Sequence, residues 1–252
     1  MSYINRVKIW FNVIYSLFAT WRGVKSNILS AEETVEVLNQ GKSLIRFGDG
    51  EFGIYRGKDI HYQKWNSNLK KDFISIKKSF EQSPGRCPYI LAIPKHYMQC
   101  GSLELCKKRV LASSWAESRL FYKRNFNLNL MYGDSFLFEK ANASIYAKLW
   151  NNIDDKRTII FVHNNPSYAD EFAKRFKRKV LFVKCPAKDA YAAIEKLLNS
   201  ILQTISLNDL SINTTQVVIS AGPAGKVLVY RLSKAGYSCI DAGHCWDEPL
   251  ES

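Results

Sequence analysis

The stretch Ser43-Leu-Ile-Arg-Phe-Gly-Asp-Gly-Glu51 marks the end of a strand and the start of a polar turn. A short apolar run, Leu44-Ile45, is followed by Arg46 and then by Gly48-Asp49-Gly50-Glu51. Glycines let the backbone turn sharply at this point. Two carboxylates at the end of a buried strand offer the hard oxygen ligands that Mn²⁺ or Mg²⁺ prefers. The alternative interpretation is a turn with two solvated acids.

Further short strands, separated by helices, are predicted after this stretch. Apolar runs at 89–93, 158–162, 179–183, 216–220 and 238–241 are typical of strands. Between 100 and 150 the pattern is helical, with an interruption at Tyr132-Gly133-Asp134. From residue 158 onward strands and helices alternate, which indicates a parallel sheet covered on both faces. We therefore expect a single α/β domain over residues 30–252, with a mostly parallel, Rossmann-like sheet and helices on both faces.

The composition is that of a globular protein with an excess of positive charge. Of the 252 residues, 46% are hydrophobic and 23% are charged. Lys and Arg number 36 against 23 Asp and Glu, which gives a formal net charge of +13. This excess favours an anionic partner, such as a phosphate-bearing substrate or an acidic membrane surface. No standard nucleic-acid motif is visible, so nucleic acid is not an expected partner. The six cysteines show no zinc spacing and are expected to be free thiols of a cytosolic protein.

Residues 1–29 are expected to form an apolar and basic helix outside the main domain. Residues 9–21 are almost continuously apolar and aromatic, with Arg6 and Lys8 before them and Arg22 and Lys25 after them. The run is shorter than the ~20 residues that a spanning helix needs, and no small-residue cleavage site of a signal peptide follows it. Two interpretations stay open. One is an amphipathic helix packed on the domain or in an oligomer interface, and the other is a helix lying on an anionic membrane surface.

Ligands of parallel sheets collect beyond the carboxyl ends of the strands, so the loops at these ends are candidate sites. They cover residues 48–51, 94–96, 163–167, 185–189, 221–225 and 243–244. In the loop 185–189, a pyrophosphate would meet both a helix N-terminus and Lys188. A solvated basic loop is the alternative there.

Residues 217–241 have the element order of a dinucleotide-binding unit. They contain a strand, a glycine-bearing turn, a helix and a strand that ends at Asp241. Dinucleotide folds bind a ribose with an acid in that position. Gly222 and Gly225 allow a phosphate to approach the helix N-terminus closely, but Ser220 stands where the first glycine of the fingerprint belongs. An NAD(P)-dependent oxidoreductase built on this unit is the alternative function. A tight turn without a ligand is the simplest interpretation.

His244 directly follows Gly243 beyond the last predicted strand. If the sheet brings it beside Asp49 and Glu51, two oxygens and one nitrogen would form an open site for Mn²⁺ or Mg²⁺. A histidine that only packs or faces solvent is the alternative.

Four motifs follow one another in a characteristic order along the chain. They are Arg46-Phe47-Gly48-Asp49-Gly50-Glu51, Cys185-Pro186-Ala187-Lys188-Asp189-Ala190, Ala221-Gly222-Pro223-Ala224-Gly225, and Gly236-Tyr237 with Ile240-Asp241-Ala242-Gly243-His244. Together they resemble the GT-D fold glycosyltransferases, a family formerly known as a bacterial domain of unknown function. The resemblance covers about residues 30–250 and departs from the family pattern at Ala242 and Asp189.

The resemblance implies metal-dependent transfer of a sugar from a nucleotide-sugar donor, expected to be a UDP-hexose. The expected acceptor is a bacterial surface glycan, a lipid-linked glycan or a glycoprotein. Asp49 and Glu51 would hold Mn²⁺ or Mg²⁺, with His244 as a third ligand. The residues expected to bind the nucleotide sugar are Arg46, Gly48, Gly50, Pro186, Lys188, Gly222, Pro223, Ala224 and Gly225.

The implied chemistry agrees with these residue types. The leaving diphosphate gains charge, which a metal ion, helix N-terminal amides and lysines stabilise. The acceptor hydroxyl needs a base, for which Asp241, His163 and Asp134 are candidates of equal rank. The residues expected to act in catalysis are Asp49, Glu51, His244 and Asp241. The expected location is the cytoplasm or the inner face of the cell membrane.

Overall fold

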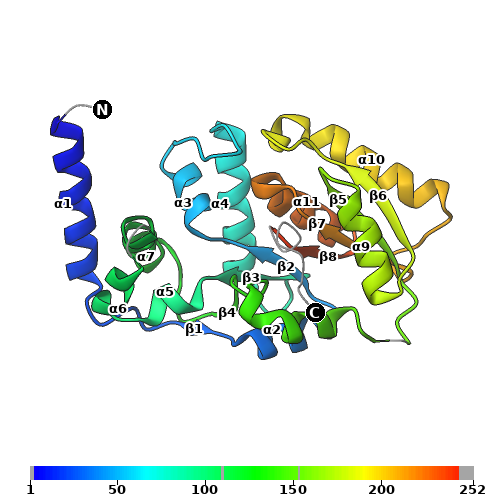
Figure 1. The fold of residues 1–252 in the computed structure, drawn as a ribbon, viewed down its shortest axis with the longest axis horizontal. Coiled ribbons are helices and arrows are strands. Elements are labelled where there is room, and N and C mark those ends of the chain that lie inside the picture. The colour runs from blue at the N-terminus through cyan, green and yellow to red at the C-terminus, as the bar shows by residue number, and fades with distance from the viewer. Residues whose placement is uncertain (1–2, 109–110, 153, 244–252) are drawn as a thin grey trace.

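In the computed structural model, which describes residues 3–108, 111–152 and 154–243, eight parallel strands form one sheet (Figure 1). The strands lie in the order β1-β4-β3-β2-β8-β7-β5-β6. Their bounds are β1 Asn27–Ile28, β2 Ser43–Arg46, β3 Tyr89–Ile93, β4 Met131–Asp134, β5 Thr158–His163, β6 Val180–Lys184, β7 Thr215–Ile219 and β8 Ser238–Asp241. The expected parallel α/β fold is therefore confirmed.

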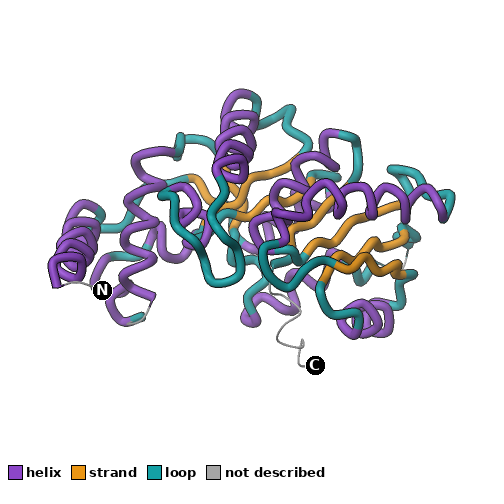
Figure 2. Tube along the Cα trace, turned by 90° about the horizontal axis from the view of Figure 1, so that it is seen from above, coloured by secondary structure: helices purple, strands orange, loops and turns teal. Residues whose placement is uncertain are grey.

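Helices cover both faces of the sheet (Figures 1 and 2). On one face lie α4 (Ser67–Gln82), α10 (Ile194–Leu207) and α11 (Gly222–Lys234), and on the other lie α2 (Ala31–Asn39), α8 (Ala143–Tyr146) and α9 (Ser167–Phe176). This division follows from right-handed crossovers, because connections that run in opposite directions along the sheet must lie on opposite faces. The remaining α-helices are α1 (Tyr3–Ala19), α3 (Asp49–Tyr55), α5 (Lys95–Gln99), α6 (Ser102–Lys107) and α7 (Ala112–Asn125).

The central strands are apolar because both of their faces are covered. All residues of β3, β5 and β7 are buried, as expected for a parallel sheet between two helical layers. Polar side chains at the strand ends and helix starts then set the boundaries. Helix α2, for example, begins with a capping box in which Glu33 N donates to Ser30 Oγ and Ser30 N donates to Glu33 Oε2.

Two strands of the sheet were not predicted. Tyr132-Gly133-Asp134, interpreted above as an interruption between helices, lies in β4, which pairs with β3. The short edge strand β1 pairs with β4 through Asn27 and Ile28. Both strands are too short and too polar to show a clear apolar run. The predicted boundary between residues 1–29 and 30–252 stays a prediction, although β1 places residues 27–28 in the sheet.

Helix α1 forms one end of the elongated molecule in both views (Figures 1 and 2). It packs on α7, with Val13 and Ser16 buried and Leu17 against the core, and Thr20 Oγ1, just after the helix, accepts a hydrogen bond from Arg119 Nε of α7. In the parts of the chain that the structure describes, no helix combines the length and apolar character needed to cross a membrane.

The connections that follow β5 and β7 lead in opposite directions across the sheet. Strand β5 continues through α9 to β6 on one side, and β7 continues through α11 to β8 on the other. Such a topological switch point leaves a crevice beyond the carboxyl ends of the strands, where open α/β sheets bind ligands.

Candidate active site

Two adjoining pockets lie beyond the carboxyl ends of the strands. The larger, of about 510 Å³, is lined by residues 46–51 between β2 and α3 and by the beginning of α11. The smaller, of about 280 Å³, lies at the switch point, where residues 163–164, 185–188 and 220–223 meet. Both pockets are also lined by His61, Tyr62, Gly222 and Gly243. They therefore form one crevice with two compartments.

Gly222, the first residue of α11, separates the two compartments. Its φ angle of +54° lies in the left-handed region, and a Cβ atom there would come within 2.8 Å of Tyr62 Cε2. Only glycine fits such a position without strain. The N-terminus of α11 therefore faces the crevice between Tyr62 and the carboxyl end of β7. The unpaired backbone amides and the positive dipole end of a helix lie at this terminus.

Asp49 and Glu51 both line the larger pocket, but they do not lie in a turn as expected. They occupy the first turn of α3, where residues two apart point ~200° away from each other. Asp49 Oδ2 accepts a hydrogen bond from Ser114 Oγ of α7. Glu51 Oε2 accepts one from Gly48 N at 2.7 Å, which caps the helix.

Lys226 of α11 is the buried cation of the larger pocket. Its Nζ lies 3.3 Å from Glu51 Oε1 and 3.2 Å from Asp241 Oδ2. Burial lowers the pKa of Lys226, but the carboxylates of Asp241 and Glu51 outweigh burial and leave this pKa above its ordinary value. The ammonium therefore stays charged at neutral pH and forms a fixed positive charge next to the carboxylates of α3.

Arg46 adds a second cation, which its neighbours hold rigidly. Its Nε donates to the backbone oxygen of Asp241 at 2.8 Å, and its Nη1 donates to the backbone oxygen of Ser135 at 2.9 Å. Gly243, with φ of +57°, leaves room for this side chain, because a Cβ there would lie 1.8 Å from Arg46 Nη2. The strand end of β2 and the segment after β8, far apart in sequence, are joined in this way.

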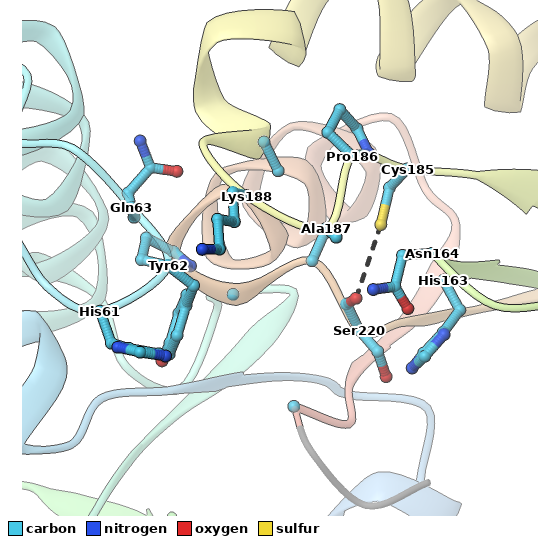
Figure 3. Close-up of a pocket in the computed structure, with 15 residues that line it drawn as sticks. His61, Tyr62, Gln63, His163, Asn164, Cys185, Pro186, Ala187, Lys188 and Ser220 are labelled. Atoms are coloured by element: carbon cyan, nitrogen blue, oxygen red, sulfur yellow. Dashed lines mark hydrogen bonds between the residues drawn. The ribbon is translucent and has the colours of Figure 1, made fainter. Parts of the chain in front are cut away.

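The smaller pocket has a different chemistry. Figure 3 shows Lys188 and Tyr62 on one side of it and His163 and Asn164 on the other. The segment 61–63 is fixed to the connection between β6 and α10, because Asp189 N donates to Tyr62 O at 2.8 Å. His163 is buried, and its Nδ1 accepts a hydrogen bond from Asn165 N at 2.9 Å.

Cys185 also lines the smaller pocket, but its thiol is a poor nucleophile. Its Sγ donates to the backbone oxygen of Ser220 at 3.7 Å (Figure 3). Burial raises the pKa of this thiol to about 11. Because the thiolate is the reactive form, Cys185 contributes packing rather than chemistry.

The donor chemistry of the larger pocket fits a hard divalent cation, because two carboxylates line one cavity. Glu51, however, is already engaged by Gly48 N and Lys226, so Asp49 is the more available ligand. Within residues 3–108, 111–152 and 154–243, no three His, Cys, Asp or Glu side chains are grouped as metal ligands. His244, the predicted third ligand, lies outside the described residues, so its convergence with Asp49 and Glu51 stays a prediction.

The remaining predicted residues divide into two groups. Those that line the crevice are Arg46, Gly48, Gly50, Pro186, Lys188, Gly222 and Pro223. Ala224 is fully buried, and Gly225 packs closely on Ile219. Both residues therefore pack the start of α11 against the sheet and do not line the crevice.

Two of the three candidate bases lie away from the crevice. Asp241 is completely buried, lines neither pocket and holds Lys226. Asp134 accepts hydrogen bonds from the backbone amides of Lys95 and Phe136. A base must reach the acceptor hydroxyl, so these positions favour a structural role for both acids. His163 lines the smaller pocket.

Sequence reasoning missed Lys226, Ser114 and Tyr62. A signal existed for Lys226, because this lysine is followed by Val227-Leu228-Val229 in a helix whose neighbouring positions are apolar. A lysine on the buried face of a helix needs a partner of opposite charge. Ser114 and Tyr62 carry no such signal, since their roles depend on contacts between distant segments.

Comparison with known families decides the assignment. The family model described as Glycosyltransferase GT-D fold matches residues 44–249. The chain belongs to the GT-D glycosyltransferase family. The resemblance inferred from the four motifs is thereby confirmed, and the match includes every motif singled out above.

Two curated relatives of this GT-D chain are streptococcal. One is "Glycosyltransferase GlyD" of Streptococcus pneumoniae serotype 4, 24% identical over 236 residues, which cover 84% of this chain and 26% of that protein. The other is "Probable glycosyl transferase Gly" of Streptococcus gordonii, 24% identical over 242 residues, which cover 86% of this chain and 32% of that protein. The GT-D chain thus spans about a quarter to a third of the length of these relatives.

Solved structures show the same fold. One, of the domain of unknown function 1792 with "a distinct glycosyltransferase fold", has a TM-score of 0.71 at 20% identity and covers 93% of this chain and 83% of that one. Another, "A New Glycosyltransferase (DUF1792) from Streptococcus sanguinis", has a TM-score of 0.68 at 22% identity and covers 88% of this chain and 82% of that one. At these identities the likeness concerns the fold of the GT-D domain.

Proposed function

We propose that this GT-D chain transfers a hexose from a UDP-sugar to a glycan, a glycoprotein or a lipid-linked glycan, with the help of Mn²⁺ or Mg²⁺. The observation that carries the proposal is the larger pocket. It places two carboxylates of α3, the buried cation Lys226 and the N-terminus of α11 around one cavity. Family membership supports sugar transfer as the reaction class.

The two compartments suit the two parts of a nucleotide-sugar donor. The diphosphate would lie at Gly222, where the α11 amides, Lys226 and Lys188 can offset its negative charge. The smaller pocket, lined by Tyr62 and Asn164, would then hold the nucleoside, and the larger pocket the sugar. A volume of about 280 Å³ lies at the lower end of the range for small-ligand pockets.

A divalent cation would be held by Asp49, with Glu51 beside it. When bound, the ion supplies positive charge to the leaving diphosphate. Glu51 would act chiefly by keeping Lys226 and the first turn of α3 in place, since its two oxygens already serve these partners. Lys226 and Arg46 contribute fixed positive charge whether or not the ion is present.

The oxidoreductase alternative has little support. The unit from β7 to β8 is present, but Asp241 at its end is fully buried and engaged by Lys226. Its carboxylate therefore does not reach a ribose in the crevice. The family match adds no evidence for hydride transfer.

A donor-hydrolysis screen tests the proposed function. Purified protein is incubated with UDP-, GDP-, CDP- and dTDP-sugars with and without Mn²⁺, and the released nucleotide is measured. We expect turnover of a UDP-sugar that depends on Mn²⁺ and is lost in Asp49→Ala. Asp170→Asn, at an exposed acid of α9, is the matched control and should retain the wild-type rate. Full turnover by Asp49→Ala, or in excess chelator, would refute the metal role.

A further inference from the structure

Helix α1 presents its aromatic side chains to the outside of the molecule. Large apolar residues that are more than a third exposed follow one another along it, and Phe18 is 77% exposed and Trp10 65% exposed. The full set is Ile9, Trp10, Phe11, Ile14, Tyr15, Phe18 and Trp21. Since residues three and four apart share a helix face, Phe11, Ile14 and Phe18 form one outward stripe of α1. Trp21 lies just beyond the end of the helix, with its ring centroid 6.0 Å from that of Phe18. We call Trp10, Phe11, Ile14, Phe18 and Trp21 the aromatic face.

The opposite side of α1 carries smaller side chains, with Val13 and Leu17 beside Ser16, and it is the side that packs on the protein. Val13, Ser16 and Thr20 are buried, and Ser102 Oγ of α6 donates to Leu17 O at 2.7 Å. An ordinary surface helix buries its apolar stripe and exposes its polar one. Helix α1 buries Val13 and packs Leu17 against the core, yet it leaves its largest apolar side chains exposed. Hydrogen bonds fix the position of α1, so the aromatic face is an exposed apolar surface of the folded domain. Exposed apolar patches of this kind mark interaction sites.

Several cations lie beside α1 and directly after its end. Lys123 Nζ donates to Ala19 O at 2.9 Å, and Arg124 Nη2 donates to Tyr15 OH at 2.7 Å, so both α7 side chains contact α1 directly. Arg22 and Lys25 follow the helix and are exposed. The formal net charge of the whole chain is +13. A partner of the aromatic face therefore meets positive charge at its border.

Two partners could cover the aromatic face, and the cations beside it favour one of them. A second copy of the chain would bring two positively charged borders together, which costs free energy at close range. An anionic lipid surface offers the opposite charge, and tryptophan and tyrosine rings suit the headgroup region. We propose that the aromatic face of α1 rests on an anionic membrane surface, with Arg22, Lys123 and Arg124 at the lipid headgroups.

Docking of this kind would place the lipid on the α1 side of α3, the helix that carries Asp49 and Glu51. A cavity of about 340 Å³ lies between α1, α7 and α3, with Tyr15 and Phe121 on one side and Phe52 and Arg56 of α3 on the other. Asp49 begins the same helix α3. A lipid-linked acceptor would thus approach the larger pocket from the α1 side. This consequence rests on the proposed function, whereas membrane docking itself does not.

Vesicle co-sedimentation tests the proposal. Wild-type protein is mixed with vesicles of phosphatidylcholine alone and with vesicles that also contain phosphatidylglycerol. We expect binding to the second kind only, and a loss of at least about tenfold in affinity for Phe18→Ser/Trp21→Ser, which removes two large apolar side chains. The second variant, Trp10→Ser/Phe11→Ser, should lose affinity for these vesicles to the same extent. Leu207→Ser/Ile212→Ser, at two exposed apolar residues away from α1, is the control and should bind as the wild type does.

Any of the following outcomes would overturn the proposal. Equal binding to both kinds of vesicle, no binding by the wild type, or unchanged binding by both α1 variants would remove lipid as the partner. A concentration-dependent dimer that dissociates in Phe18→Ser/Trp21→Ser would assign the aromatic face to a second copy. Circular dichroism and UDP-sugar hydrolysis in solution, measured on the same variants, should equal those of the wild type. These readouts separate docking from the sugar-transfer proposal.

Discussion

Replacement of Lys226 by methionine should destabilise the protein far more than an ordinary lysine substitution. Lys226 is only 7% exposed and pairs with Glu51, 7% exposed, and Asp241, which is completely buried. Methionine keeps the length of the side chain but leaves Glu51 buried without its cation, and leaves Asp241 with Arg46, whose Nη2 lies 4.0 Å from Asp241 Oδ1. Breaking a buried ion pair by removing one partner costs about 3–5 kcal/mol. For a chain of this size, such a loss lowers the melting temperature by roughly 6–20 °C.

The pH dependence of this loss has a predictable sign. Burial without a cation raises the pKa of a carboxyl group, so the folded variant would hold its protons more tightly than the unfolded chain. Stability from such a group is present at low pH and is lost as pH rises through the folded-state pKa. The deficit of Lys226→Met should therefore be larger at pH 8 than at pH 5.

Urea and thermal unfolding, followed by circular dichroism at both pH values, measure this effect. Lys234→Met is the matched control, because Lys234 lies on the same helix but is exposed, and its replacement should change stability by less than about 0.5 kcal/mol. A deficit of Lys226→Met below about 1 kcal/mol, or one that does not change with pH, would refute the buried ion network.

Three further substitutions test other parts of the account. Burial raises the pKa of Asp134 above its ordinary value, so wild-type stability falls as pH rises through the folded-state pKa. Asp134→Asn should therefore melt higher than wild type at pH 7 and equally at acid pH. Gly222→Ala forces a Cβ toward Tyr62 at positive φ and should cost about 1–3 kcal/mol in thermal unfolding, whereas Gly85→Ala, in open space, should be neutral. Lys188→Ala should raise the donor KM about tenfold in steady-state kinetics through loss of one phosphate contact, with Lys184→Ala as a control that leaves it unchanged.

Much of the fold could be predicted because the central strands are continuous apolar runs. The six predicted strands correspond to β2, β3 and β5 to β8, and their alternation with helices indicates the parallel sheet. The exceptions have a physical reason. Strand β1 is the edge strand and has only two residues, and β4 beside it is a four-residue strand that contains Gly133 and Asp134, so Tyr132-Gly133-Asp134 gives no strand signal.

The candidate site was predicted in its position but not in its contacts. The rule that ligands collect at strand ends brings the segments around Asp49, Lys188 and Gly222 together, and all three line the crevice. The rule does not say that α3 begins directly at Asp49. Nor does it show that Lys226 engages Glu51, because that contact depends on the packing of α3 against α11. Pairing between segments so far apart in sequence leaves no local pattern.

Binding of UDP by isothermal titration calorimetry, with and without Mn²⁺, tests the central claim most directly. The claim is that the crevice formed by the two pockets binds a nucleoside diphosphate, with the diphosphate at Gly222 and a divalent cation held by Asp49. We predict that Mn²⁺ strengthens UDP binding to the wild type and that Asp49→Asn abolishes this gain while binding without the ion persists. If Mn²⁺ strengthens UDP binding equally in both proteins, or if the wild type binds no UDP, the claim is wrong.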